Sequence, residues 1–285
     1  MNFSTELITL ETDDGVVLSG ALWAPSYGGS RTAVALFPGT GAEFYEPLFI
    51  RLGEQLAAAG FTTLSLNRRD HGQNFGLQTL HDGAMDQRYA VDLLTGRGAG
   101  RVLMAGHSYG TVTVPYYIAE TDDPRVAGLI FLAALGDLRR GSLLMLGSQE
   151  RYDQAVAEAE QAVAAGRGSE PFLIPPMVPG YPPMLHSYSV FLDKRGPASR
   201  AVPVDLVRHV GDRPIFAIRD AADPFPATLP PARKMLEAAN PNLSYVLLEK
   251  RETDEVSANA HYFDGCEDEV FRHLMAWMQR HGFMS

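Results

Sequence analysis

The sequence predicts an α/β protein with a mostly parallel sheet of eight strands flanked by helices. Short apolar segments bounded by turn residues alternate with segments of helical periodicity, a pattern typical of parallel strands joined by crossover helices. Only Asp13, Asp14 and Gly15 separate the first two strands, which we therefore expect to pair as an antiparallel hairpin. The eight predicted strands cover residues 5–12, 16–25, 32–37, 61–67, 101–105, 126–135, 214–220 and 243–249.

Two helical segments carry the apolar stripe that packs against such a sheet. The first begins at Pro47, a residue that suits the first turn of a helix, and ends before Gly60. Its stripe consists of Phe49, Leu52 and Leu56. The last segment of the chain has a similar stripe, formed by Val270, Leu274, Trp277 and Met278. We expect both helices to lie on the sheet.

Residues 136–203 interrupt the alternation of strands and helices. An ordinary crossover between neighbouring parallel strands needs about a dozen residues or somewhat more, so this stretch indicates an insertion. Residues 148–166 read as one amphipathic helix, and a segment rich in proline and aromatic residues follows. The predicted stripe of that helix is Tyr152, Val156, Ala159 and Val163. We predict a core of residues 1–135 and 204–285 with a helical cap formed by residues 136–203.

Composition narrows the class of protein further. The formal net charge is −10, from 34 acidic and 24 basic residues, which argues against a nucleic-acid partner. No apolar run approaches the ~18 residues that a membrane span requires. The first residues lack a basic segment followed by an apolar one, and Cys266 is the single cysteine. We expect a cytoplasmic protein without an internal disulfide. The histidine spacings match no zinc motif, so we expect no metal.

Ser108 is the first candidate for chemistry. It lies in the sequence Gly106-His107-Ser108-Tyr109-Gly110, directly after a predicted strand and before a helix-compatible segment. A tight turn that pushes the serine outward leaves no room for β-carbons on either side of it, so both flanking positions require glycine. The alternative is a glycine-rich loop with a serine that faces solvent.

This strand, turn and helix arrangement resembles the nucleophile elbow of the α/β-hydrolase family, and the resemblance covers nearly the whole chain. In that family the serine is followed by an acid after a later strand and by a histidine before the final helix. The resemblance implies Ser108 as nucleophile, Asp223 as acid and His261 as base. A serine hydroxyl needs such an imidazole to take its proton, and the imidazole needs a carboxylate to orient it.

Other readings of these positions remain open. Asp220 precedes Asp223 by three residues at the strand end and is the main rival acid, and Asp137 is a more distant one. Asp223 could instead be a helix cap or turn residue. His261 could be a loop histidine bound to the backbone.

The resemblance also implies an oxyanion hole made of two backbone N–H groups, those of Tyr109 and Thr40. The family often has His-Gly where this chain has Pro38-Gly39, but a backbone donor does not depend on that side chain. A plain glycine-rich turn is the alternative. Residues 67–74 resemble a further family segment, in which we read Arg69 and His71 as structural. We expect His107 to pack into the elbow.

These residues together predict a serine hydrolase that cleaves a carboxylic ester through an acyl-enzyme and needs no cofactor. Thioesterase, lactonase, amidase, carbon–carbon hydrolase and acyltransferase reactions share the same constellation. An alternative from another class is a protein on the same fold that binds a small ligand without turning it over.

The expected substrate is a small molecule with a medium-sized hydrophobic or aromatic acyl or alcohol group; the oligomeric state is left open. This expectation rests on apolar cap residues that would line a pocket if they faced Ser108. An equal alternative is that they form the core of the cap itself. The residues are Phe172, Leu173, Met177, Tyr181, Met184, Tyr188 and Phe191.

Overall fold

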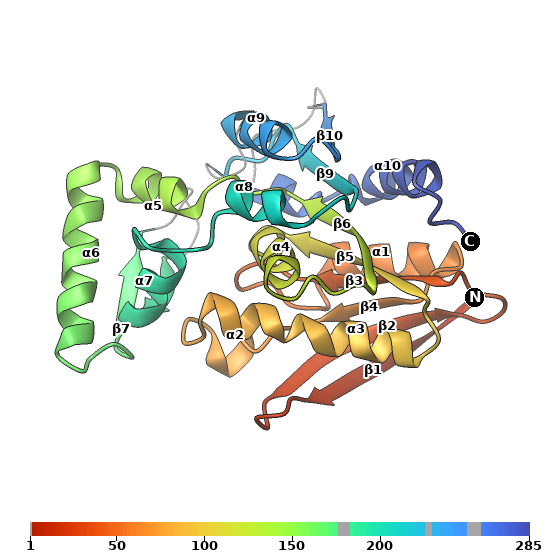
Figure 1. Ribbon diagram of the computed structural model, residues 1–285, viewed down its shortest axis with the longest axis horizontal. Coiled ribbons are helices and arrows are strands. Elements are labelled where there is room, and N and C mark those ends of the chain that lie inside the picture. Colours follow the sequence, from red (N-terminus) through yellow and green to blue (C-terminus); the bar gives the residue numbers. More distant parts are fainter. Residues whose placement is uncertain (1, 176–182, 226–229, 250–257) are drawn as a thin grey trace.

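The computed structural model describes residues 2–175, 183–225, 230–249 and 258–285. Its centre is an eight-stranded sheet, with the strand order β1-β2-β4-β3-β5-β6-β9-β10 (Figure 1). The strands are β1 (Phe3–Glu11), β2 (Val17–Pro25), β3 (Thr32–Phe37), β4 (Thr63–Leu66), β5 (Arg101–His107), β6 (Val126–Leu132), β9 (Ile215–Asp220) and β10 (Leu243–Leu248). All eight predicted strands are therefore present.

The pairing of the strands confirms a mostly parallel sheet. β1 pairs with β2 and β2 with β4 in antiparallel fashion, and every other neighbouring pair is parallel. The predicted end of β6 at residue 135 is wrong, because the strand stops at Leu132. Ala133 follows with a φ of 55°, a left-handed conformation that turns the chain out of the sheet.

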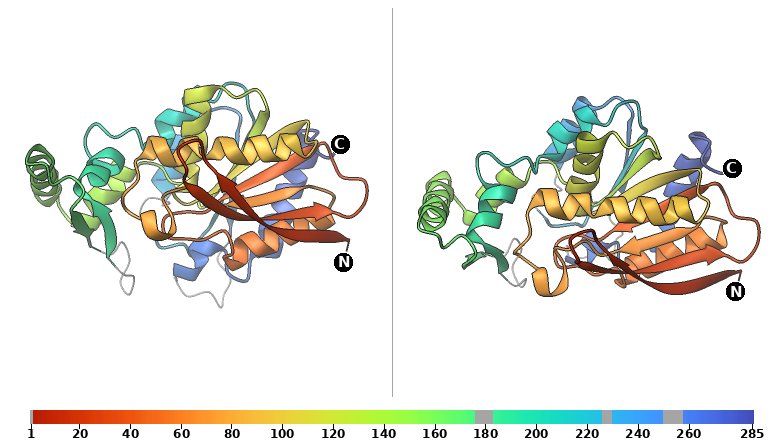
Figure 2. Two further views of the ribbon diagram at one scale, coloured as in Figure 1. Left: turned by 90° about the horizontal axis from the view of Figure 1, so that it is seen from below. Right: turned by 60° about the horizontal axis from the view of Figure 1, so that its bottom comes forward.

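Helices cover both faces of the sheet (Figure 2). One face carries α1 (Pro47–Ala58) and α10 (Glu267–Arg280). The opposite layer contains α2 (Leu80–Met85), α3 (Gln87–Gly96), α4 (Gly110–Thr121), α8 (Pro203–Leu206) and α9 (Pro230–Ala239). Each layer has its own apolar cluster against the strands, which are buried on both sides as parallel strands usually are.

The helices α1 and α10 follow the predicted stripes. Phe49, Leu52 and Leu56 are buried on α1, and the chain leaves that helix through Gly60, whose φ is 98°. On α10 all four predicted stripe residues are buried. Burying a large apolar side chain stabilises a fold by roughly 1.5–3 kcal/mol, so these stripes are sufficient to dock both helices.

A second body of structure lies beside the sheet, at the left of Figure 1. Its elements are α5 (Leu138–Leu146), α6 (Gln149–Ala164), β7 (Pro171–Ile174), β8 (Met184–Ser187) and α7 (Tyr188–Arg195). We refer to them as the cap; the division of the chain at residues 136 and 203 stays a prediction. The antiparallel pair of β7 and β8 was not predicted, because each strand has only four residues and the segment between them is rich in proline.

The predicted helix of the cap is present as α6, which begins after the capping side chain of Ser148. Tyr152, Val156 and Ala159 are buried as predicted. The prediction for Val163 is wrong, since this side chain is 40% exposed and Ala162 takes the buried position instead. Val163 follows Tyr152 by eleven residues, close to three turns of 3.6 residues, so the helical spacing holds and the exposure of Val163 is set by what packs against the last turn of α6.

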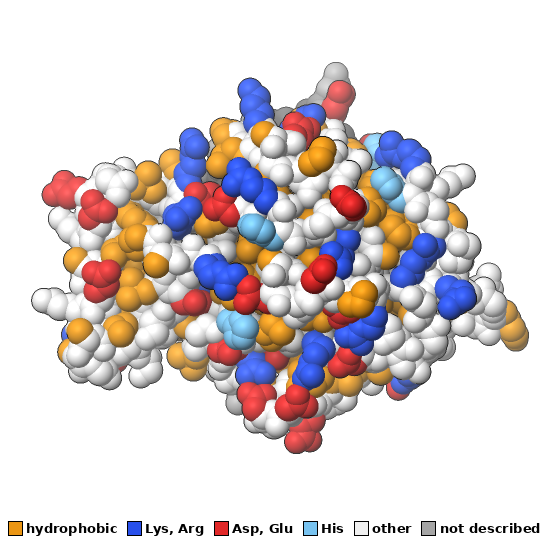
Figure 3. Space-filling model, in the orientation of Figure 1, with side chains coloured by type: hydrophobic (Ala, Val, Ile, Leu, Met, Phe, Trp, Pro, Cys, Tyr) orange, Lys and Arg blue, Asp and Glu red, His pale blue; other side chains and the backbone are white. Residues whose placement is uncertain are grey.

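The surface shows no gathering of basic residues on the face in Figure 3, where Lys and Arg side chains are interspersed with Asp and Glu. Within the described ranges, no helix combines the length and the apolar composition that crossing a membrane demands.

Candidate active site

Ser108 occupies a strained turn at the carboxyl end of β5. Its φ is 51°, in the left-handed region that non-glycine residues avoid at a cost of about 1–3 kcal/mol. The backbone N–H of Ser108 donates to the carbonyl of Leu132 on β6 at 2.9 Å, and α4 begins two residues later. The strand, turn and helix predicted around Ser108 are therefore observed.

The turn has no room for a β-carbon at either of its two glycines, as the sequence predicted. A β-carbon on Gly106 would lie 2.1 Å from the carbonyl oxygen of Gly110, and one on Gly110 would lie 2.5 Å from that of Phe37. A β-carbon on Gly39 would lie 2.7 Å from the Cβ of Ser108. The loop after β3 is thus packed directly against the serine.

His261 and Asp223 form a buried hydrogen-bonded pair. The ring Nδ1 of His261 lies 2.9 Å from Oδ2 of Asp223, and the two residues are 3% and 2% exposed. The other carboxylate oxygen accepts the backbone N–H of Phe225 at 2.9 Å. Burial raises the pKa of Asp223. The opposing effects together are larger: the hydrogen bond and charge of His261, the N–H group of Phe225 and the charge of Arg219 all lower this pKa. The net pKa is below the ordinary value, so this carboxylate is charged at neutral pH.

The rival acids have other partners. Asp220 accepts the backbone N–H of Ala222 at 2.7 Å, and its second oxygen lies 3.6 Å from the sulfur of Cys266. Asp137 caps the first turn of α5. Of the three acidic residues, Asp223 is the one that contacts His261.

The side chain of His107 binds the backbone of His261, whereas Asp223 binds its ring. Nε2 of His107 lies 2.8 Å from the backbone carbonyl of His261, so that nitrogen carries the hydrogen. The His107 ring is fully buried, and burial, with the charge of His261, lowers its pKa to about 3. His107 is therefore neutral and packs into the elbow as expected, but its bond to His261 was not predicted.

Ser108 and His261 both line a cavity of about 280 Å³, which the cap also helps to enclose. Its walls are mostly apolar, with Phe75, Leu138 and Phe225 among them. The ring of Phe225 lies 4.2 Å from that of His261, centre to centre, and helps to fix its plane. The residues that line the cavity are Thr40, Gly41, Phe75, Ser108, Tyr109, Leu135, Leu138, Pro183, Met184, Arg195, Phe225, His261 and Tyr262.

Thr40 and Tyr109 line this cavity next to Ser108. Among the described residues, neither backbone N–H donates to another group, so both remain available to an oxygen atom of a ligand. Two such donors beside a nucleophile are the arrangement that stabilises an oxyanion.

The cap residues predicted to bind substrate divide into four groups. Met184 lines the cavity. Phe172 packs against Phe191 and Tyr188, with ring centres 4.7 and 5.3 Å apart, so these three form the core of the cap, the alternative that the sequence had left open. Leu173 is 63% exposed. The remaining two, Met177 and Tyr181, lie outside the described residues.

Sequence reasoning missed most of the cavity wall. A positional signal existed for Leu135, which follows β6, for Phe225, which follows Asp223, and for Tyr262, which adjoins His261. Leu135 and Phe225 lie just beyond strands that end at the same edge of the sheet, where parallel strands usually form binding sites. Phe75, in the segment after β4, and Arg195, in the cap, had no comparable signal.

The two residues read as structural in the segment after β4 have structural partners. Arg69 forms ion pairs with Asp14 at 2.7 Å and with Asp86 at 2.9 Å. His71 is buried, and burial lowers its pKa to about 4. Within the part of the chain that the structure describes, no group of three or more His, Cys, Asp or Glu side chains could hold a metal ion.

The chain belongs to the alpha/beta hydrolase family, whose sequence model matches residues 34–280. A comparison with curated protein sequences gives no match. Solved structures with a similar fold include DcsB in complex with its substrate analogue, with a TM-score of 0.73 at 17% identity over 97% of this chain and 99% of the other.

Two further proteins with solved structures have the same fold. Est1E from Butyrivibrio proteoclasticus, with ferulic acid bound, has a TM-score of 0.71 at 17% identity and covers 96% of this chain and 98% of its own. A thermostable carboxyl esterase from Bacillus coagulans, in complex with glycerol, has a TM-score of 0.70 at 14% identity and covers 99% of both chains. At these identities the likeness concerns the fold.

Proposed function

We propose that this protein is a serine hydrolase that cleaves a carboxylic ester through an acyl-enzyme on Ser108. The observation that carries the proposal is the 2.9 Å hydrogen bond between His261 and Asp223 at the wall of the cavity into which the strained Ser108 turn opens. Membership of the alpha/beta hydrolase family and the fold shared with the carboxyl esterase support the same reaction class.

In the first half-reaction, Oγ of Ser108 attacks the carbonyl carbon of the ester while Nε2 of His261 takes the hydroxyl proton. Asp223 holds the opposite ring nitrogen and stabilises the imidazolium that forms. The carbonyl oxygen becomes an oxyanion between the N–H groups of Tyr109 and Thr40, each worth about 3 kcal/mol in comparable sites. The intermediate then collapses, and the leaving alkoxide departs with the proton from His261.

In the second half-reaction, His261 takes a proton from water, and the resulting hydroxide attacks the acyl carbon. Collapse of the second intermediate breaks the bond to Oγ, which recovers the proton from His261. The approach of Oγ to Nε2 is a contact that typically tightens once substrate fills the site. An acyl group between apolar walls suits this cavity, and its volume fits a small molecule.

We place the reaction in the cytoplasm, because the chain has a single cysteine and therefore no internal disulfide, as expected for a reducing compartment. Thioesters and other activated acyl compounds would follow the same steps with a different leaving group.

A fluorophosphonate probe tests the proposal, since it forms a covalent bond with an activated serine. We expect labelling of the folded protein that is lost in Ser108→Ala and kept in Ser26→Ala, an exposed serine remote from the cavity. Labelling of the folded protein that persists in Ser108→Ala would refute the assignment of the nucleophile. A folded protein that is never labelled would instead favour a ligand-binding role without turnover.

A further inference from the structure

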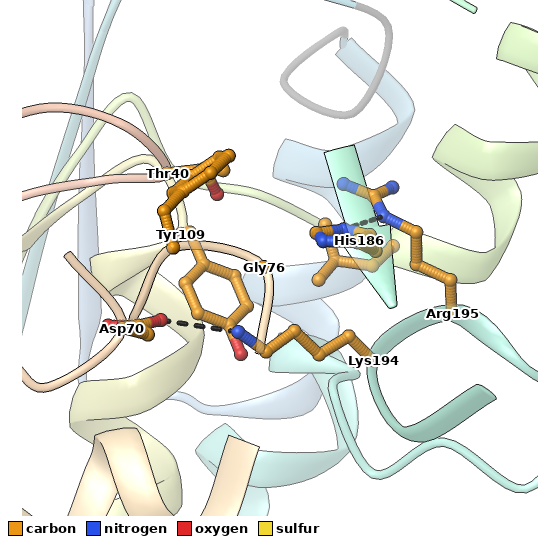
Figure 4. A pocket seen from close by; sticks show the side chains of 9 residues that line it. Thr40, Asp70, Gly76, Tyr109, His186, Lys194 and Arg195 are labelled. Carbon is orange, nitrogen blue, oxygen red and sulfur yellow. Dashed lines mark hydrogen bonds and ion pairs between the residues drawn. The ribbon is translucent and has the colours of Figure 1, made fainter. Parts of the chain in front are cut away.

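The cavity is mostly apolar, but one residue in its wall, Arg195, carries a charged guanidinium group. Arg195 ends α7 and is 3% exposed. It lines the cavity that holds Ser108 and His261, and it also lines a small polar recess next to it, shown in Figure 4. Thr40 and Tyr109 line both spaces, so the recess adjoins the proposed oxyanion hole.

The partners of this guanidinium are all uncharged. Its Nε donates to Nε2 of His186 at 3.3 Å, and one terminal nitrogen donates to the hydroxyl of Ser142 at 3.0 Å. The other terminal nitrogen lies 3.0 Å from the sulfur of Met184, a weak acceptor. Burial lowers the pKa of His186 well below its ordinary value, so that ring brings no charge of its own.

No carboxylate within the described ranges forms an ion pair with Arg195, which is unusual for a buried arginine. Burial lowers the pKa of Arg195 to about 10, which leaves the group protonated at neutral pH. A buried cation without a counter-ion is costly to a fold, because its lost hydration is not replaced by an opposite charge. Such a group is retained at a binding site when the ligand supplies the charge.

The residues around Arg195 strengthen the positive potential. Lys194 lies 3.2 Å from Oδ2 of Asp70, and Arg68 lies 3.2 Å from Oδ1 of the same carboxylate. Figure 4 shows Lys194 reaching past the ring of Tyr109 to Asp70, while Arg195 lies apart beside His186. Asp193 is committed elsewhere, to the backbone N–H of Leu80 at 2.6 Å. Lys194 and Arg68 thus share the buried carboxylate of Asp70, which is already paired with two cations.

We propose that Arg195 binds a carboxylate of the substrate, so that the ester cleaved at Ser108 carries an anionic group at the far end of an apolar body. The polar ends match the two polar parts of the cavity, and the apolar body matches the walls formed by Phe75, Leu138 and Phe225. A carboxylate accepts two parallel hydrogen bonds from a guanidinium, a geometry that neutral ligands do not reproduce. This inference rests on the proposed function. It adds an anionic group to the apolar acyl or alcohol part of the substrate, which makes the substrate amphipathic.

The carboxylate could belong to the acyl or to the alcohol part of the ester, and paired substrates distinguish the two. For the acyl part, we would compare mono-4-nitrophenyl esters of succinic, glutaric, adipic and suberic acid with the same compounds capped as methyl esters. For the alcohol part, butyrate esters of ω-hydroxy acids would be compared with their methyl esters. The measured quantity is the ratio of kcat/KM for the carboxylate to kcat/KM for its capped partner.

We expect this ratio to exceed roughly ten in one arm at the best chain length, as the strength of a charge-assisted hydrogen bond predicts. In Arg195→Met the ratio should fall to about one or below, and Arg195→Lys, which keeps the charge without the planar fork, should lie in between. Arg200→Met is the matched control, since Arg200 lies on the same segment but is exposed and pairs with Glu120. This control should keep the ratio of the unchanged protein.

A ratio of one or less at every length in both arms would overturn the inference, as would an unchanged ratio in folded Arg195→Met. Should that variant not fold, inhibition of the unchanged protein decides. Free suberate should inhibit at least about tenfold more strongly than suberamide, and equal inhibition would overturn the inference. Failure of the proposed function differs, because then neither member of any pair would be hydrolysed and Ser108 would not be labelled.

Discussion

The Nε2–H group of His107 donates to the backbone carbonyl of His261 across 2.8 Å. The residue directly before the proposed nucleophile therefore holds the main chain of the proposed base. Since Asp223 binds the ring of His261, the proposed base is positioned both at its side chain and at its backbone. His107 itself is buried beneath the turn and acts through His261, so we regard it as a positioning residue.

The first prediction concerns this contact. His107→Leu removes the donor and should lower kcat for ester hydrolysis by about tenfold or more with little change in KM, because a base that is displaced by a fraction of an ångström transfers protons less well. His107→Gln keeps an N–H donor and should recover much of kcat. Steady-state kinetics on both variants measure the effect. Equal kcat values in the two variants would count against a positioning role.

The second prediction concerns stability against pH. The pKa of His107 is about 3 in the native state against an ordinary value of 6.5, so between these pH values the unfolded chain binds a proton here that the native state does not. The contribution of His107 to the free energy of unfolding therefore rises by about 1.4 kcal/mol per pH unit as pH increases through this window. It falls by the same amount as pH decreases.

Urea unfolding at several pH values between about 4 and 6 measures that slope. His107→Gln, which cannot be protonated, should reduce the slope of unfolding free energy against pH by the contribution of one proton, about 1.4 kcal/mol per pH unit. His273→Gln is the control, because the side chain of His273 is 40% exposed whereas that of His107 is buried. The same slope in the His107→Gln variant and the unchanged protein would disprove the linkage.

The third prediction separates the two candidate acids. Asp223→Asn removes the charge that supports the imidazolium and should lower kcat by about 10³- to 10⁴-fold. Asp220→Asn should have a much smaller effect, since Asp220 contacts Ala222 and Cys266 instead of the histidine. Purified variants with matched thermal unfolding would be assayed side by side. A larger loss in Asp220→Asn would reverse the assignment.

The fourth prediction concerns the strain at Ser108. Alanine keeps the cost of a φ of 51°, whereas glycine does not, so Ser108→Gly should be more stable than Ser108→Ala by about 1 kcal/mol. The glycine loses more freedom on folding, and this reduces the difference without reversing it. Chemical unfolding of the two inactive variants tests the claim. An alanine variant that equals or exceeds the glycine variant in stability would show that the turn is relaxed.

Local patterns explain which parts of the fold were predictable. The turn at Ser108 depends on two glycines within five residues, and the stripes of α1 and α10 depend on the helical repeat, so both are visible in the sequence. The prediction for Val163 was wrong because this residue keeps the helical spacing but lies in the last turn of α6, where tertiary packing decides which side chains are buried. The two strands of the cap were too short to give a periodic signal.

The site shows the same division. The chain order of Ser108, Asp223 and His261 follows a family pattern, but the choice between Asp223 and Asp220 required coordinates. Nothing in the sequence around Arg195 marks it, because its surroundings are assembled from α5, β8 and α7 by packing of the cap. The absence of a carboxylate from that assembly, within the described residues, is a property of the tertiary structure alone.

The most direct measurement is the state of Ser108 during turnover of whichever 4-nitrophenyl ester is hydrolysed fastest. Rapid mixing followed by acid quench and peptide mass spectrometry should find the acyl group on the peptide that contains Ser108, together with a burst of about one nitrophenolate per chain where deacylation is the slower step. Ser108→Ala should give neither. Hydrolysis at an undiminished rate in Ser108→Ala, or an acyl group carried by a different residue, would contradict the account.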